Sequence, residues 1–166
     1  MNIEIVRARQ RLDYVFSLVD QLPAEAEVQS HWARYLCVLV SGFVEKAIRV
    51  MYEEYAGAAA APNVARFVKE NLKFFQNPSM GKIVELTRTF NEGWADDLEV
   101  FTDGRLKDAV NSIVANRHNI AHGETVGISI SRMSDYYRGA IEVVEFLNHQ
   151  CNGGAVASHG MEGTSR

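Results

Sequence analysis

The three prolines of this chain, Pro23, Pro62 and Pro78, all fall between segments whose apolar residues recur every three or four positions. Proline is poorly tolerated inside an α-helix, whereas a repeat of three to four positions places apolar side chains on one helical face. The pattern therefore predicts an all-α fold in which the prolines separate the helices. The chain has 166 residues, of which 47% are apolar, and this is enough to bury the core of one domain.

The apolar spacing predicts five to six helices, with a long second helix at the centre of the core. This second helix covers about residues 25–56 and becomes apolar on all sides between Tyr35 and Val44, which is typical of a buried helix. The same spacing predicts helices at about residues 5–19 and 64–75. A further helix is expected after the cap Ser79, with Gly93 as a stop, and residues 92–103 are expected to form a loop or a short helix. The last two helices are expected from Gly104 to a glycine cap at Gly123, and after the cap Ser131.

These helices are expected to form a single domain over residues 1–150. Residues 151–166 mix glycine and serine with no apolar period, so we expect a flexible tail there. The longest apolar run is shorter than the about 20 residues needed to cross a membrane, and the N-terminus lacks a signal-peptide pattern. Cys37 and Cys151 have no metal-ligand spacing. We therefore expect a cytoplasmic protein without a membrane segment.

Residues 117–123, Arg-His-Asn-Ile-Ala-His-Gly, concentrate an arginine and two histidines directly before a predicted helix end. The net charge of the chain is −4, so a surface that attracts nucleic acid as a whole is excluded and any such contact has to be local. Arginine presents a planar set of donors suited to phosphate oxygens, and histidine exchanges protons near neutral pH. This combination suits phosphodiester chemistry.

Three interpretations of this segment remain open on the residues alone. The cationic side chains could simply complement the negative end of the helix dipole, worth about 0.3–1 kcal/mol each. His118 and His122 are four residues apart, a spacing that can bind zinc, although Asn119 replaces the catalytic glutamate of the His-Glu-x-x-His metalloproteases and no third ligand is recognisable. The third interpretation is metal-free acid-base cleavage of RNA.

Several segments resemble a known family. Arg117-x4-His122, ending in Ala-His-Gly, resembles the signature of the HEPN superfamily. Residues 35–46, Tyr-Leu-Cys-Val-Leu-Val-Ser-Gly-Phe-Val-Glu-Lys, residues 75–78, Phe-Gln-Asn-Pro, and residues 112–117, Ser-Ile-Val-Ala-Asn-Arg, are similar to the RiboL-PSP-HEPN family. The likeness covers roughly residues 5–148. One departure is His118, because that family usually has asparagine after the arginine.

The resemblance implies a small helical domain that forms a homodimer and, in active members, cuts RNA without a metal or other cofactor in a cleft between the two protomers. Many members act as toxins held by an antitoxin or as components of antiphage defence. The alternative is a catalytically inactive HEPN module that binds RNA or a protein partner. The substrate, the partner and the trigger of activity are not specified by the sequence.

Within that resemblance, the residues have distinct expected roles. His122 is expected to act as general acid or base, and Arg117 to hold the charged phosphorane, with His118 and Asn119 orienting the phosphate or the arginine. Glu45 either pairs with Arg49 on its own helix or reaches across to fix Arg117. On a regular helix Arg117 and His122 point about 140° apart. We therefore expect the helix to end at His122 and a two-fold partner to complete the site.

Overall fold

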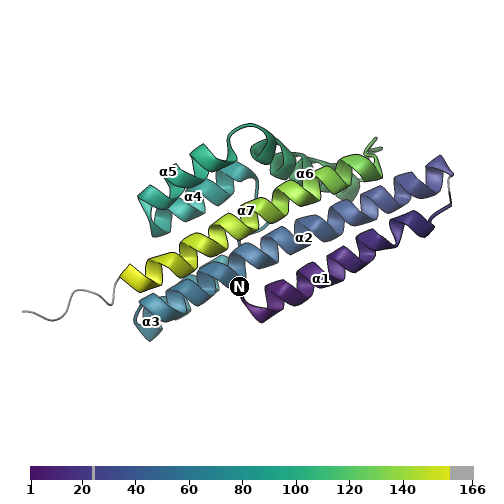
Figure 1. Cartoon of the computed structure of the whole chain (residues 1–166). Coiled ribbons are helices and arrows are strands. Elements are labelled where there is room, and N and C mark those ends of the chain that lie inside the picture. Colours follow the sequence, from purple (N-terminus) through teal and green to yellow (C-terminus); the bar gives the residue numbers. More distant parts are fainter. Residues whose placement is uncertain (24, 158–166) are drawn as a thin grey trace, which may run out of the picture.

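The computed structural model describes residues 1–23 and 25–157, with side chains up to residue 153. Within these ranges the chain forms seven α-helices, one short 3-10 helix and no strand (Figure 1), so the all-α prediction is confirmed. The helices are α1 (Ile3–Ser17), η1 (Val19–Gln21), α2 (Ala26–Ala59), α3 (Pro62–Leu72), α4 (Met80–Phe90), α5 (Glu92–Thr102), α6 (Arg105–Ala121) and α7 (Ile130–Ala157).

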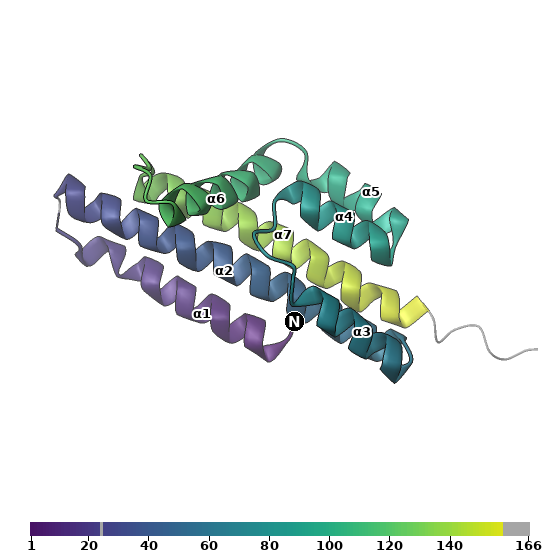
Figure 2. The same cartoon turned by 180° about the vertical axis from the view of Figure 1, so that it is seen from behind.

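Helices α2 and α7 lie side by side and form the centre of the bundle (Figures 1 and 2). Helix α1 packs along α2, α6 packs against both central helices, and α4 and α5 pair with each other beside α7. Side chains of α2 face the core from several directions, as expected for its apolar centre. Those that are fully buried include Leu36, Val40, Ile48 and Tyr52.

The contact between α6 and α7 is close because α7 carries a glycine there. A Cβ atom built on Gly139 would lie 3.0 Å from the Cβ of Ala109 on α6. Real Cβ atoms rarely approach so closely, so a larger residue would push the two helices apart. This crossing fixes the first two turns of α6 against α7.

Two helix boundaries differ from the sequence predictions. Residues 92–102 form a complete helix, and Gly93 lies inside α5 instead of stopping α4. Asn91 separates α4 from α5, since its side chain accepts a hydrogen bond from the amide of Trp94 at 3.0 Å. The predicted cap Ser79 is confirmed, because its hydroxyl accepts from the Lys82 amide.

The last helix also begins and ends elsewhere than predicted. Ser129, not Ser131, caps α7, and its Oγ accepts a hydrogen bond from the Arg132 amide at 3.2 Å. Helix α7 continues past Cys151 to Ala157, and residues 158–166 of the expected tail lie outside the described residues. None of the helices in the described part of the chain combines the length and hydropathy needed to cross a membrane.

Candidate functional site

Helix α6 ends in a well-formed glycine cap at the segment that the sequence analysis singled out. His122 is the C-cap residue, and Gly123 follows in the left-handed conformation with φ of +74°. The Gly123 amide donates to the carbonyl of Ile120 at 3.1 Å, and the Glu124 amide donates to that of Asn119 at 2.9 Å. These two bonds define a Schellman motif, so the predicted end of the helix at Gly123 is confirmed.

The cap brings the two histidines of this segment together on the surface. His118 and His122 are both exposed, and their ring centroids are 4.4 Å apart with an interplanar angle of 55°. They stand one helical turn apart, which places their side chains on the same side of α6. When two imidazoles are in contact, one can accept a proton from a substrate while the other donates a proton to it.

Arg117 lies on the same last turn and is half-buried. Within the described residues it forms no ion pair and no side-chain hydrogen bond, in contrast to Arg105 on the first turn of α6, which holds Glu142 at 2.8 Å. The structure therefore brings the two imidazoles into contact but does not join Arg117 to either of them. Its guanidinium remains available to an anion from outside the protomer.

Glu45 pairs with Arg49, as one of the two alternatives in the sequence analysis has it, and also has a partner that the sequence analysis did not consider. Its carboxylate accepts a hydrogen bond from the amide of Asn77 at 3.1 Å and lies 3.9 Å from the guanidinium of Arg49. No ion pair joins it to Arg117 in the described part of the chain. Of the two alternatives, the structure of the protomer therefore has the pair with Arg49, and the same carboxylate also holds the turn between α3 and α4.

The turn around Asn77 connects segments of the family-like pattern that are far apart in the sequence. Asn77 adopts a left-handed conformation with φ of 49°, and the hydrogen bond that its amide donates to Glu45 holds it there. The side chain of Asn111 on α6 accepts from the amide of Met80, the first residue of α4, at 2.9 Å. Asn77 and Asn111 thus position the turn against α2 and α6. The sequence analysis gave neither residue a role, although an asparagine before proline is a signal for such a turn.

Asn119 contributes to the site through its backbone. Its carbonyl accepts the amides of both His122 and Glu124, so it helps to fix the cap that carries His122. Its side chain is half-buried and forms no hydrogen bond with the described residues. The expected role of Asn119 in orienting phosphate or arginine stays a prediction.

The arrangement of ligand-type side chains does not point to a resident metal ion. Among the described residues, no group of three or more histidine, cysteine, aspartate or glutamate side chains is placed to hold one. His118 and His122 supply two ligands, whereas protein zinc sites use at least three protein ligands.

The structure is a helical bundle whose penultimate helix carries Arg-x4-His at its end, as the resemblance to HEPN domains implied. A model of the RiboL-PSP-HEPN family matches residues 5–153, and the chain belongs to this family. HEPN domains as a class are associated with nuclease or RNA-binding functions. No curated protein and no solved structure matches the chain.

Proposed function

We propose that this protein is a metal-independent endoribonuclease that cuts RNA at the end of α6. The observation that carries the proposal is the exposed pair of imidazoles, 4.4 Å apart, next to an arginine that has no ion-pair or hydrogen-bond partner among the described side chains. General acid-base cleavage needs one group to remove a proton and another to deliver one. It also needs a fixed cation for the charge that develops on the phosphate, and Arg117 meets that need.

In the proposed reaction His122 removes the proton of the ribose 2′-hydroxyl or protonates the leaving 5′-oxygen. The 2′-oxygen forms a bond to phosphorus, and the bond from phosphorus to the 5′-oxygen breaks. The products are a 2′,3′-cyclic phosphate and a free 5′-hydroxyl, so no water and no oxidant enters the step. His118 contacts His122 and is placed to handle the complementary proton transfer or to orient the phosphate.

A homodimer completes the site in this proposal. Arg117 and His122 lie on an open surface of the protomer, and a two-fold partner would turn two such surfaces into one cleft. On α2, Tyr35, Val38 and Gly42 are exposed at spacings of three and four residues, which places them on one helical face. The buried Cys37 contacts the Ile113 carbonyl at the middle of α6, so this part of α2 packs beside α6 while its exposed apolar face points away from that contact and is open to a partner.

The proposal is tested with purified protein and a labelled single-stranded RNA. Wild type is expected to cleave the RNA in the presence of a chelator, to leave a 2′,3′-cyclic phosphate, and to show a bell-shaped dependence of rate on pH across the neutral range. His122→Ala is expected to lower the rate by about 100-fold or more. The matched control is His149→Ala, which removes an exposed histidine of α7 and should leave the rate unchanged.

Arg117 gives a second, independent readout. Arg117→Lys keeps the positive charge but loses the planar set of donors, so we expect a large loss of rate with little change in melting temperature. Cleavage that needs a divalent cation and leaves a 3′-hydroxyl would overturn the mechanism. Full activity in Arg117→Lys would reduce the arginine to a general electrostatic role.

The alternative function is an inactive HEPN module that binds RNA or a protein partner. The observation that favours it is that Arg117 contacts neither imidazole within the protomer, so the site is incomplete in a single chain. RNA binding by wild type without any cleavage, and without a difference from His122→Ala, would support this alternative.

We further propose that the nuclease acts as a toxin or antiphage-defence component restrained by a partner protein. Expression of wild type beside His122→Ala in growing cells tests this role. Arrested growth and degraded RNA with wild type alone are expected. Equal growth and intact RNA in both would contradict it.

A further inference from the structure

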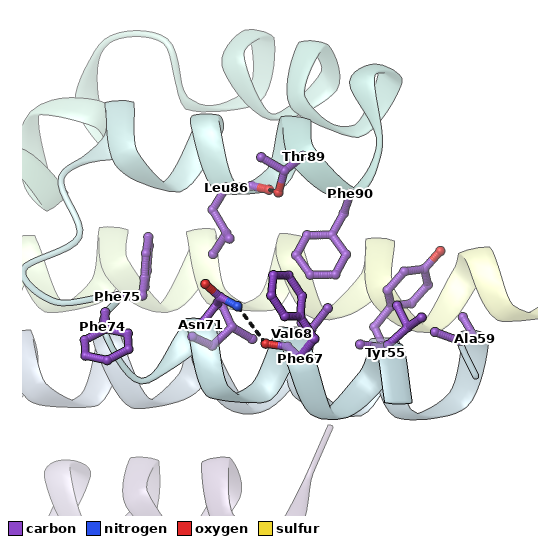
Figure 3. A pocket seen from close by; sticks show the side chains of 14 residues that line it. Tyr55, Ala59, Phe67, Val68, Asn71, Phe74, Phe75, Leu86, Thr89 and Phe90 are labelled. Carbon is purple, nitrogen blue, oxygen red and sulfur yellow. Dashed lines mark hydrogen bonds between the residues drawn. The ribbon is translucent and has the colours of Figure 1, made fainter. Parts of the chain in front are cut away.

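An apolar groove lies at the opposite end of the bundle from the last turn of α6 (Figures 1 and 3). It has a volume of about 580 Å³ and is lined mainly by aromatic and aliphatic side chains of α2, α3, α4 and the segment that follows α3. Figure 3 shows Phe67, Phe75, Leu86 and Phe90 directed toward the space between α3 and α4. None of its lining residues belongs to the proposed RNA site.

The walls of the groove are two helices of 11 residues each that run in opposite directions (Figure 3). Helix α3 packs against α2, and its other apolar side chains stay uncovered. At 1.5 Å per residue each wall is about 16 Å long, the length of about three helical turns. The space therefore has the length of one short helix laid between α3 and α4.

Two phenylalanines at the open side of the groove are strongly exposed. Phe67 is 69% and Phe74 is 84% accessible to solvent. Val64, on the same helix and three residues before Phe67, is 47% accessible. Exposed apolar patches of this kind on soluble domains mark interaction sites, since isolated aromatic side chains in water gain free energy when another surface covers them.

The few polar side chains in the groove already have partners on their own helices. The Asn71 amide donates to the Phe67 carbonyl at 2.8 Å, and the Thr89 hydroxyl donates to the Leu86 carbonyl at 2.7 Å. The residues that line the groove carry no charged side chain, and Lys73 and Lys69 beside it are paired with Glu70 and Glu53. Recognition in this groove therefore depends on apolar shape.

We propose that the groove binds one amphipathic helix of a different protein, with large apolar side chains spaced three to four residues apart on one face. This is the mode in which a helix lays its apolar stripe into a preformed groove. A helix of about three turns matches the walls in length. Four apolar side chains along it would cover both exposed phenylalanines.

A second copy of this chain fits less well than such a partner. Aromatic side chains offer about 150–250 Å² each, so Phe67, Phe74 and Val64 together expose roughly 400 Å². This is about half of the roughly 800 Å² that each partner buries in a stable interface. Away from the groove, no described helix exposes more than two large apolar side chains, as with Val100 and Phe101 on α5. The helices in the described part of the chain therefore lack the stripe that the groove would accept.

Occupation of the groove would leave the RNA site free. On α2, Tyr55 lines the groove and Cys37 contacts α6. These two residues are 18 positions apart in the sequence. That separation is roughly 27 Å along the helix. The groove is thus a second functional surface, and its test does not depend on RNA cleavage.

The probe is a synthetic fluorescent helix of about 14 residues, with leucines in one stripe on a background of glutamate, lysine and alanine. A second peptide of the same composition carries the leucines scattered around the helix. Fluorescence anisotropy is expected to show at least ten-fold tighter binding of the striped peptide to wild type. Phe67→Glu and Phe74→Glu are each expected to weaken that binding ten-fold or more.

The matched control is Val100→Glu, which places the same charge at a side chain of α5 that is 80% exposed. It should leave peptide binding unchanged, and circular dichroism should show all three variants folded, because the replaced side chains are exposed. Equal binding of the two peptides, or striped-peptide binding that both phenylalanine variants retain, would overturn the proposal. A shift from dimer to monomer in Phe74→Glu would assign the groove to a second copy instead.

Discussion

At the scale of single residues, the two thiols show how burial changes acid-base chemistry. Cys37 and Cys151 are both buried and unpaired, and the Cys37 thiol donates to the Ile113 carbonyl at 3.5 Å. Burial disfavours the charged thiolate and raises the pKa of Cys37 to about 11 and that of Cys151 to about 12. Both thiols therefore stay protonated and inert in the folded chain at neutral pH.

These thiols predict a loss of stability in mild alkali. In the unfolded chain a thiol has a pKa of about 8.5, so above that pH the unfolded state loses protons while the folded state keeps them. The free energy of unfolding should therefore fall as pH rises from about 8.5 to 10. Denaturant titrations at several pH values should show a shallower fall in a Cys37→Ala, Cys151→Ala variant. Parallel curves for the two proteins would contradict this explanation.

Single residues also show what the sequence allowed us to predict about the site. The end of a helix at Gly123 and the grouping of His118 with His122 follow from local spacing, and the structure has both. The pair of Glu45 with Arg49 also follows from local spacing, whereas the bond that Glu45 accepts from the Asn77 amide does not, because it depends on where the turn at Asn77 packs in three dimensions. Whether Arg117 meets an imidazole depends on a second chain in the proposed dimer, so that contact stays a prediction.

At the scale of elements, the cap of α6 controls the direction of the chain after His122. Gly123 supplies a left-handed residue at the point where the Schellman bonds form. A residue with a Cβ atom is strained in that conformation, by about 1–2 kcal/mol. The position of His122 relative to α6 therefore depends on Gly123. No atom lies within 4 Å of a Cβ atom built on Gly123, so the strain of a larger residue there would come from the backbone conformation.

Gly123→Ala is expected to lower the free energy of unfolding by about 1 kcal/mol or more because of this strain. The matched control is Gly127→Ala, four residues later, where φ is not positive and no atom lies within 4 Å of an added Cβ. That change should be neutral or slightly stabilising. Thermal unfolding followed by circular dichroism compares the two. Equal melting temperatures would show that the cap is not strained by alanine.

The residue types around a helix end predict some helix boundaries of this chain but not others. Ser79 was predicted as a cap and is one, whereas Ser129 and Ser131 are equally suited by residue type and only the structure distinguishes them. Asn91 likewise ends α4 before the expected glycine. On α3, periodicity correctly showed an apolar face, but no local pattern tells whether a neighbouring element covers that face.

At the scale of the whole molecule, the proposed dimer determines whether the site is complete. We expect wild type to sediment as a dimer at micromolar concentration, with Tyr35 and Val38 in the interface. Val38→Glu introduces a charge that would have to be desolvated there, so this variant should sediment as a monomer and lose RNA cleavage. Val100→Glu on α5 should do neither. A wild-type monomer with full cleavage activity would contradict the two-chain site.

The orientation of α6 has a consequence for how RNA would reach this protein. The carbonyl pole of a helix carries partial negative charge, and the chain as a whole has a net charge of −4. Long-range attraction therefore does not guide a polyanion to the exposed histidines, and Arg117 first has to offset the field of its own helix. Encounter would be slow, and affinity would rest on few phosphate contacts with a correspondingly shallow dependence on salt. The proposed nuclease would therefore act on RNA that is abundant or is brought to it.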